Sequence, residues 1–173
     1  MKDYWLAKLI SSVREVDSRK RLQKSIYLLQ RSGCPLQFSY IFHYYGPYSF
    51  ELAGLIDQLD GAHIIKETPE QLSNSVVRYR SKITPRGRKA LAKFEKSRIG
   101  GDLKSQISKF IKPFKTLNQK DPGLLELAAT TSYFYRGRWA EAQKQTVIFK
   151  KLPRNDSKLK QALELAKDFK PSG

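Results

Sequence analysis

The sequence predicts a mainly α-helical protein with one small β-hairpin and a helical extension at its C-terminal end. Two observations predict this class. Apolar residues recur three and four positions apart in most segments, as they do over residues 3–15, and this spacing gives a helix one apolar face. Apolar and polar residues alternate instead from Val77 to Ile83, which is the pattern of a strand with one buried face.

Two further helices and a short connecting segment come next. The first helix is predicted over 18–32, where polar residues able to cap it precede and glycine and proline follow. Residues 36–45 are rich in aromatic and β-branched side chains, which favours a strand and leaves a short helix open. We expect a sharp turn at 46–49 and the second helix over 50–60.

A hairpin and another helix follow. Residues 62–66 predict a short strand, the polar stretch 67–75 a loop, and 76–83 the returning strand. Thr84 is placed to cap a helix that begins at Pro85, because the first turn does not need the N–H that proline lacks. The order helix, turn, helix, hairpin, helix is close to that of a winged helix-turn-helix, in which a recognition helix enters the DNA groove.

Gly100-Gly101 is the clearest interruption of the helical pattern, and we predict a domain boundary there. Residues 1–99 would form a winged helix-turn-helix-like domain with an N-terminal helix, and residues 102–173 a helical extension. Pro113 is expected to kink or end the first helix of the extension. Further helices are predicted from residue 121, over 139–152 and over 156–169.

The charge balance is strongly positive. Lysine and arginine number 33 against 16 aspartates and glutamates, a formal net charge of +17. This excess favours a polyanionic partner, although the solvated surface of a lysine-rich protein would have the same composition. A single cysteine, Cys34, excludes an internal disulfide and a multi-cysteine zinc site, so neither a metal nor a cofactor is predicted. With no signal-peptide pattern and no long apolar run, we expect a cytoplasmic protein without a membrane partner.

Basic residues concentrate between Val76 and Lys120, where 14 lysines and arginines oppose only Glu95 and Asp102. Strand alternation and helical spacing place many of them on one continuous surface, which could hold phosphates without reading bases. The predicted nucleic-acid-binding residues are Arg78, Arg80, Lys82, Arg86, Arg88, Lys89 and Lys93.

The predicted recognition helix does not match this surface. It contains Glu51, Asp57 and Asp60 and no lysine or arginine, and only Gln58 has a side chain suited to reading adenine. Acidic side chains are repelled by DNA phosphates, so this helix could instead contact a partner protein. The candidates for such a contact are Tyr45, Tyr48, Phe50 and Gln58.

Three motifs resemble the YwgA-like family of prokaryotic proteins. They are the LQKSIYLL segment at 22–29, the YGPYSFEL segment at 45–52 and the LLELAAT segment at 124–130. A more distant similarity is to the Panacea-domain antitoxins, which also pair an LQK-type helix with a downstream YGP turn. The resemblance implies a winged-helix-like fold and a regulatory or toxin-neutralising role, and it supplies no catalytic residues.

The leading functional hypothesis from the sequence is a DNA-binding regulator that holds the backbone of duplex DNA. The alternatives are an antitoxin or adaptor-type module that binds a protein such as a toxin, and an RNA-binding protein. No enzyme is predicted, because His43 and His63 have no matched carboxylate or nucleophile at readable spacing. The amphipathic helices of the extension could pack against a second copy and form a homodimer.

Overall fold

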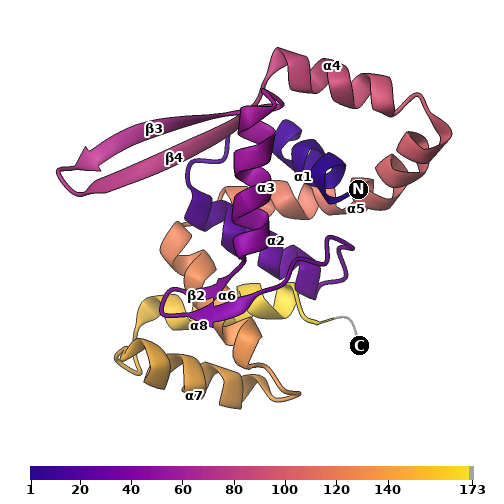
Figure 1. Ribbon diagram of the computed structural model, residues 1–173. Helices are drawn as coiled ribbons and strands as arrows, with labels where there is room; N and C mark the ends of the chain where they lie inside the picture. The colour runs from indigo at the N-terminus through magenta and orange to yellow at the C-terminus, as the bar shows by residue number, and fades with distance from the viewer. Residues whose placement is uncertain (172–173) are drawn as a thin grey trace.

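The computed structural model describes residues 1–171 (Figure 1). Within that range the chain is mostly helical, with eight helices and two small antiparallel sheets. The elements are α1 (Lys2–Ser11), α2 (Arg19–Arg31), β1 (Ile41–His43), β2 (Gly46–Tyr48), α3 (Phe50–Gly61), β3 (Ile65–Ser73), β4 (Val76–Ile83), α4 (Pro85–Phe94), α5 (Arg98–Asn118), α6 (Pro122–Phe134), α7 (Trp139–Lys150) and α8 (Ser157–Asp168). No helix of this range combines the length and the apolar composition needed to cross a membrane.

Helix α2 lies at the centre of the molecule. Ser18 caps it by accepting a hydrogen bond from the Arg21 amide, and every residue from Arg21 to Leu29 is buried. The helix packs against α5, α6 and the strands β2 and β4, so it is covered on several sides. This central position brings the LQK segment of α2 into contact with the backbone of residues 47–49.

The β3–β4 hairpin projects from the body of the molecule (Figure 1). Its base is anchored by the buried Ile65 and Ile83, which pair directly, while most residues toward the tip are exposed. The predicted loop at 67–75 is wrong, because β3 continues to Ser73. Toward its tip the two-stranded ribbon has no buried face, so residues there need not alternate, and cross-strand backbone hydrogen bonds hold it together.

The smaller hairpin, β1–β2, pairs Ile41 with Tyr48 and His43 with Gly46. The predicted sharp turn at 46–49 is wrong, because Gly46–Tyr48 is a strand and the turn lies one step earlier, at 44–45. Gly46 has a positive φ of 83°, and a Cβ there would lie 2.6 Å from the Thr130 hydroxyl. Only glycine allows the hairpin to approach α6 this closely.

The predicted interruption at Gly100-Gly101 is also wrong. Both glycines lie in the first turn of α5, which Ser97 caps by accepting from the Gly100 amide. A Cβ at Gly100 would overlap the backbone carbonyl of Phe94, so glycine is needed for packing against the end of α4 rather than for a break. The helix also continues through Pro113 to Asn118 instead of ending there.

Residues on both sides of the glycine pair contribute to one hydrophobic core. The indole Nε1 of Trp5 donates to the backbone oxygen of Leu103 at 3.0 Å, which joins α1 to α5. Helix α6 is buried over most of its length between α2, α7 and α8, as its nearly uniform apolar composition predicts.

Candidate nucleic-acid interface

Helix α4 presents a row of basic side chains to solvent. Its inner face is Gly87 and Leu91, and a Cβ at Gly87 would overlap the backbone oxygen of Ile64, so α4 lies directly against the base of the hairpin. The Thr84 hydroxyl accepts from the Gly87 amide at 2.9 Å and fixes where the helix begins. Leu91 completes the buried face, which leaves the basic positions on the outside.

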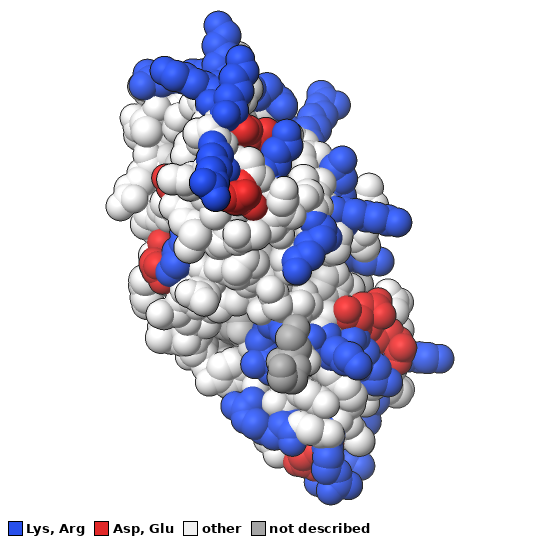
Figure 2. All heavy atoms as spheres, turned by 90° about the vertical axis from the view of Figure 1, so that its right-hand side faces the viewer, with Lys and Arg blue, Asp and Glu red and all other residues white. Residues whose placement is uncertain are grey.

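The outward side chains of α4 are Arg86, Arg88, Lys89 and Lys93, and all four are exposed. In the part of the chain that the structure describes, none of them forms an ion pair with a carboxylate. Figure 2 shows lysine and arginine side chains gathered at the end of the molecule that carries α4. These four predicted residues are therefore brought together, and their charge is not neutralised internally.

The base of the β3–β4 hairpin adds two more cations. Lys66 lies directly opposite Lys82 in the strand register, and both side chains are exposed. Like charges at directly opposed positions repel each other, and a bound anion would relieve that repulsion. Lys66 is absent from the predicted site, because the sequence does not give the register of the two strands.

Arg78 and Arg80 differ from the other predicted cations. Arg78 Nε donates to Glu70 at 2.8 Å, and Arg80 contacts Glu70 at 3.0 Å and Glu15 at 3.3 Å. The guanidinium of Arg78 holds the pKa of the Glu70 carboxyl below its usual value. The sequence did not predict that Glu70 pairs with these arginines, because β3 was expected to end before residue 70. These two arginines are thus already paired.

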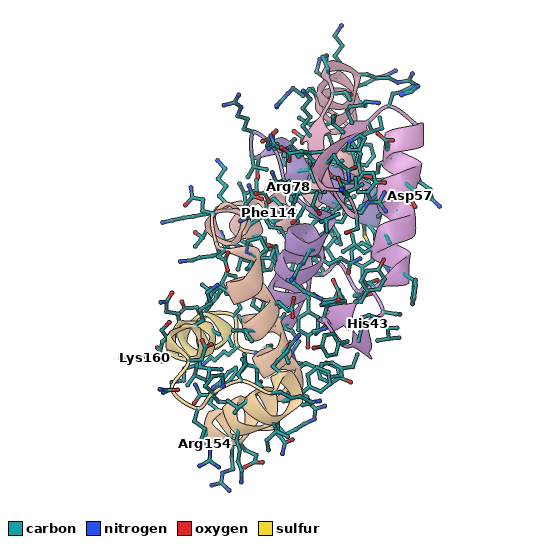
Figure 3. All side chains as sticks on the ribbon, turned by 90° about the vertical axis from the view of Figure 1, so that its left-hand side faces the viewer. His43, Asp57, Arg78, Phe114, Arg154 and Lys160 are labelled. Atoms are coloured by element: carbon teal, nitrogen blue, oxygen red, sulfur yellow. The ribbon has the colours of Figure 1, made fainter. Side chains whose placement is uncertain are left out.

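The acidic residues of α3 are also engaged. Glu51 pairs with Lys2 at 2.5 Å, and Asp57 pairs with Arg19 at 2.5 Å. Asp60 accepts the backbone N–H of Glu67 at 2.8 Å. Figure 3 shows Asp57 on α3 and Arg78 on the neighbouring hairpin. The field outside α3 is therefore less negative than its sequence suggests, but the helix still offers no basic side chain to a DNA groove.

Of the four candidate partner-binding residues, the three aromatic ones form one surface and Gln58 lies apart from them. Tyr45 and Phe50 are 55% and 69% exposed, and the half-buried Tyr48 packs edge-on against Phe50 at 5.1 Å between ring centroids. Tyr44 is exposed beside them. Gln58 is also exposed but lies two turns farther along α3, so it does not belong to the same cluster.

The three sequence motifs meet where α2, β2 and α6 come together. The Gln23 side chain donates to the backbone oxygen of Ser49 at 2.8 Å and accepts from its amide at 2.9 Å. The Lys24 ammonium donates to the Pro47 carbonyl at 2.7 Å. Thr130 supplies the hydroxyl next to Gly46. We call the contact of residues 23, 24, 46–49, 126 and 130 the motif junction.

Glu126 is the carboxylate of the motif junction. Burial opposes its ionisation, but the ammonium groups of Lys150 and Lys20 bind it and hold its pKa below the usual value. Lys24 is 2% exposed, and no carboxylate of residues 1–171 lies within ion-pair distance of it. Burial lowers its pKa to about 8. No periodic pattern in the sequence joins these residues, and the two lysines that bind Glu126, Lys20 and Lys150, are 130 positions apart.

Comparison with known proteins identifies a relative. The chain is 32% identical over 129 residues to YwgA of Bacillus subtilis (strain 168), an uncharacterised protein, and the match covers 75% of this chain and 72% of that one. The chain belongs to the YwgA family. A search of protein-family models gave no match.

Because YwgA is an uncharacterised protein, the roles of this chain's residues are inferred from their geometry. The predicted basic residues of this YwgA-family chain separate into a free group at α4 and Lys82 and a paired group at Arg78 and Arg80. Among residues 1–171, no three or more His, Cys, Asp or Glu side chains are grouped so that they could hold a metal ion.

Proposed function

We propose that this chain is a DNA-binding regulatory protein of winged helix-turn-helix-like form, which holds the phosphate backbone of duplex DNA. The observation that carries the proposal is the set of exposed cations on α4 and at the base of the β3–β4 hairpin, which have no carboxylate partners among residues 1–171. They are Lys66, Lys82, Arg86, Arg88, Lys89 and Lys93. Cations arranged in this way contact phosphates and position a protein on a duplex.

The order of elements supports the same proposal. Helices α2 and α3 are followed by the β3–β4 hairpin, and this order is typical of winged helix-turn-helix proteins, with α3 as the recognition helix and the hairpin as the wing. The lack of basic residues on α3 argues against base reading by this helix. The proposed binding is therefore electrostatic and carries little sequence preference on its own.

Fluorescence anisotropy of the full chain with a random-sequence DNA duplex, from about 50 to 300 mM salt, tests the proposal. Phosphate contacts release counterions, so six contacts predict a slope of about −5 in log affinity against log salt concentration. Lys66→Glu with Lys82→Glu should weaken binding strongly. The matched control is Lys144→Glu with Lys160→Glu, two exposed lysines on α7 and α8. Absence of binding at the lowest salt would contradict the proposal.

The same titration separates DNA from RNA. An RNA duplex offers the same phosphate charge in A-form geometry, with a deep, narrow major groove. If RNA competes more strongly than DNA of equal length, the chain is an RNA-binding protein that uses the same cations. If DNA is preferred, the regulator proposal stands.

A second candidate function is a protein-interaction module of the antitoxin or adaptor type. The exposed cluster of Tyr44, Tyr45 and Phe50 favours it, because aromatic side chains are enriched where proteins bind each other. Co-purification of the full chain from its native host, with and without Tyr45→Ala and Phe50→Ala, tests this candidate. A partner lost only in the variant would support it, and a chain that purifies alone would speak against it.

A further inference from the structure

A cavity of about 190 Å³ lies between α2, β2 and α3, beside the motif junction. Three basic residues from α2 contribute to its lining, namely Arg19, Lys20 and Lys24. Two of them already have carboxylate partners: Arg19 bonds Asp57 and Glu67, and Lys20 bonds Glu126. The remaining cation, Lys24, has no carboxylate partner in the part of the chain that the structure describes.

Lys24 lacks most of the hydrogen bonds that a buried ammonium requires. An ammonium has three N–H donors, and the Pro47 carbonyl, at 2.7 Å, accepts from one of them. The Glu126 oxygens bind Lys20 and Lys150 instead. A buried cation with so few acceptors is unfavourable in the free protein, so a carboxylate in the cavity would supply what is missing.

The charges around the cavity set the charge of the ligand. The cations that line the cavity are Arg19, Lys20 and Lys24. Their ion-pair network adds the carboxylates of Asp57, Glu67 and Glu126 and the ammonium of Lys150, which binds Glu126. Four positive groups against three negative ones leave one positive charge without a counterpart. A ligand with a single negative charge would balance the site, whereas a dianion such as a phosphate ester would exceed it.

The walls of the cavity set the shape of the ligand. Tyr45 and Tyr48 form one side, and the apolar Ala53 and Ile56 of α3 form another. Aromatic and aliphatic walls favour a flat, apolar ligand body. The volume is sufficient, since an apolar cavity of roughly 150 Å³ holds a benzene ring.

We propose that this cavity is a binding site for a small aromatic monocarboxylate, whose carboxylate pairs with Lys24 and whose ring lies between the tyrosines and α3. The site goes beyond the proposed function, because it needs no nucleic acid. Arg19 connects it to the rest of the molecule: this side chain bonds α3 through Asp57 and β3 through Glu67, and its guanidinium lies over the ring of Tyr79 at 5.2 Å.

Benzoate is the probe, and calorimetric titration and thermal unfolding of the full chain without DNA are the measurements. We expect 1:1 binding of benzoate and a higher melting temperature. Benzamide, which has the same shape but no charge, and acetate, which has the charge but no ring, should each bind at least tenfold more weakly. Equal effects of all three compounds, or no binding of benzoate at millimolar concentration, would overturn the proposal.

Two variants locate the site. Lys24→Met removes the charge and should abolish benzoate binding, and Ala53→Leu fills the cavity without changing any charge and should do the same. The second variant keeps the test decisive if the first does not fold. Lys144→Met, an exposed lysine on α7, is the matched control and should bind benzoate normally. Benzoate binding that survives Ala53→Leu would place the ligand elsewhere. Because no DNA is present, the outcome is independent of the DNA-binding proposal.

Discussion

Two groups of basic residues in this protein differ in what surrounds them. At α4 and the base of the β3–β4 hairpin the cations are exposed and have no carboxylate partners within the described residues. At the motif junction, Lys20 and Lys150 bind Glu126 and Lys24 is buried. The first group is available to a large polyanion from solvent. In the second group, Lys24 is buried, and we propose that it binds a ligand small enough to enter the cavity. The position of a lysine, more than the number of lysines, decides what it can bind.

Removal of the junction carboxylate should have the largest effect on stability. Glu126→Gln leaves Lys20 and Lys150 without their partner. Loss of one member of a fully buried ion pair costs about 3–5 kcal/mol, and because this pair is only partly buried we expect a loss at the lower end, about 3 kcal/mol. Urea unfolding at pH 7 measures this loss. Glu164→Gln is the control, because its pair with Lys167 is on the surface and should contribute less than about 1 kcal/mol. Similar losses of stability in both variants would contradict the expectation that the ion pairs of Glu126 contribute more than a surface pair does.

The pH dependence of the free energy of unfolding should reveal the burial of the Lys24 ammonium. The pKa of Lys24 falls to about 8 on folding, so between this value and the unfolded value of 10.5 the unfolded chain binds more protons. The stability of the native sequence relative to Lys24→Met should therefore rise with pH across that window, by up to about 3 kcal/mol. Both chains are unfolded at each pH, and the difference between their free energies of unfolding removes the contributions of titrating groups that the two chains share. These groups include Glu126, Lys20 and Lys150. A difference that does not change with pH would contradict the burial of this charge.

Neutralisation at α4 should have the smallest effect on stability. Lys89→Gln with Lys93→Gln removes two exposed charges that have no ion-pair partners, so the free energy of unfolding should change by less than about 0.5 kcal/mol. Thermal and urea unfolding of this variant provide the measurement. A large destabilisation would mean that these side chains serve the fold, and their role in binding would lose its basis.

The helices were predictable from the sequence because their signals are local. Apolar spacing placed α2 and α3 closely, and the ranges predicted for α7 and α8 end within two residues of those observed. Thr84 with Pro85 marked the start of α4 correctly. The sequence could not show that Gly100 serves close packing against Phe94, because that contact depends on how α5 folds back on α4.

The candidate sites were harder to predict, because they depend on contacts between distant residues. To predict that Arg78 and Arg80 pair with Glu70, one must know that β3 extends to Ser73. The sequence of β3 does not show this, because it lacks the alternation that marks a half-buried strand. Lys24 and Pro47 are 23 positions apart, and Glu126 is about a hundred residues from Lys20, so nothing local joins them. The motifs indicated which segments matter, and only the structure shows that they touch.

The most direct test compares free and paired cations in the same assay. The slope of log affinity against log salt concentration for a DNA duplex should become shallower by about 2 in Lys89→Gln with Lys93→Gln, because two phosphate contacts are lost. Arg78→Gln with Arg80→Gln should change the slope by less than half as much, since Glu70 and Glu15 already neutralise those arginines. An equal or larger change in the arginine variant would contradict the account.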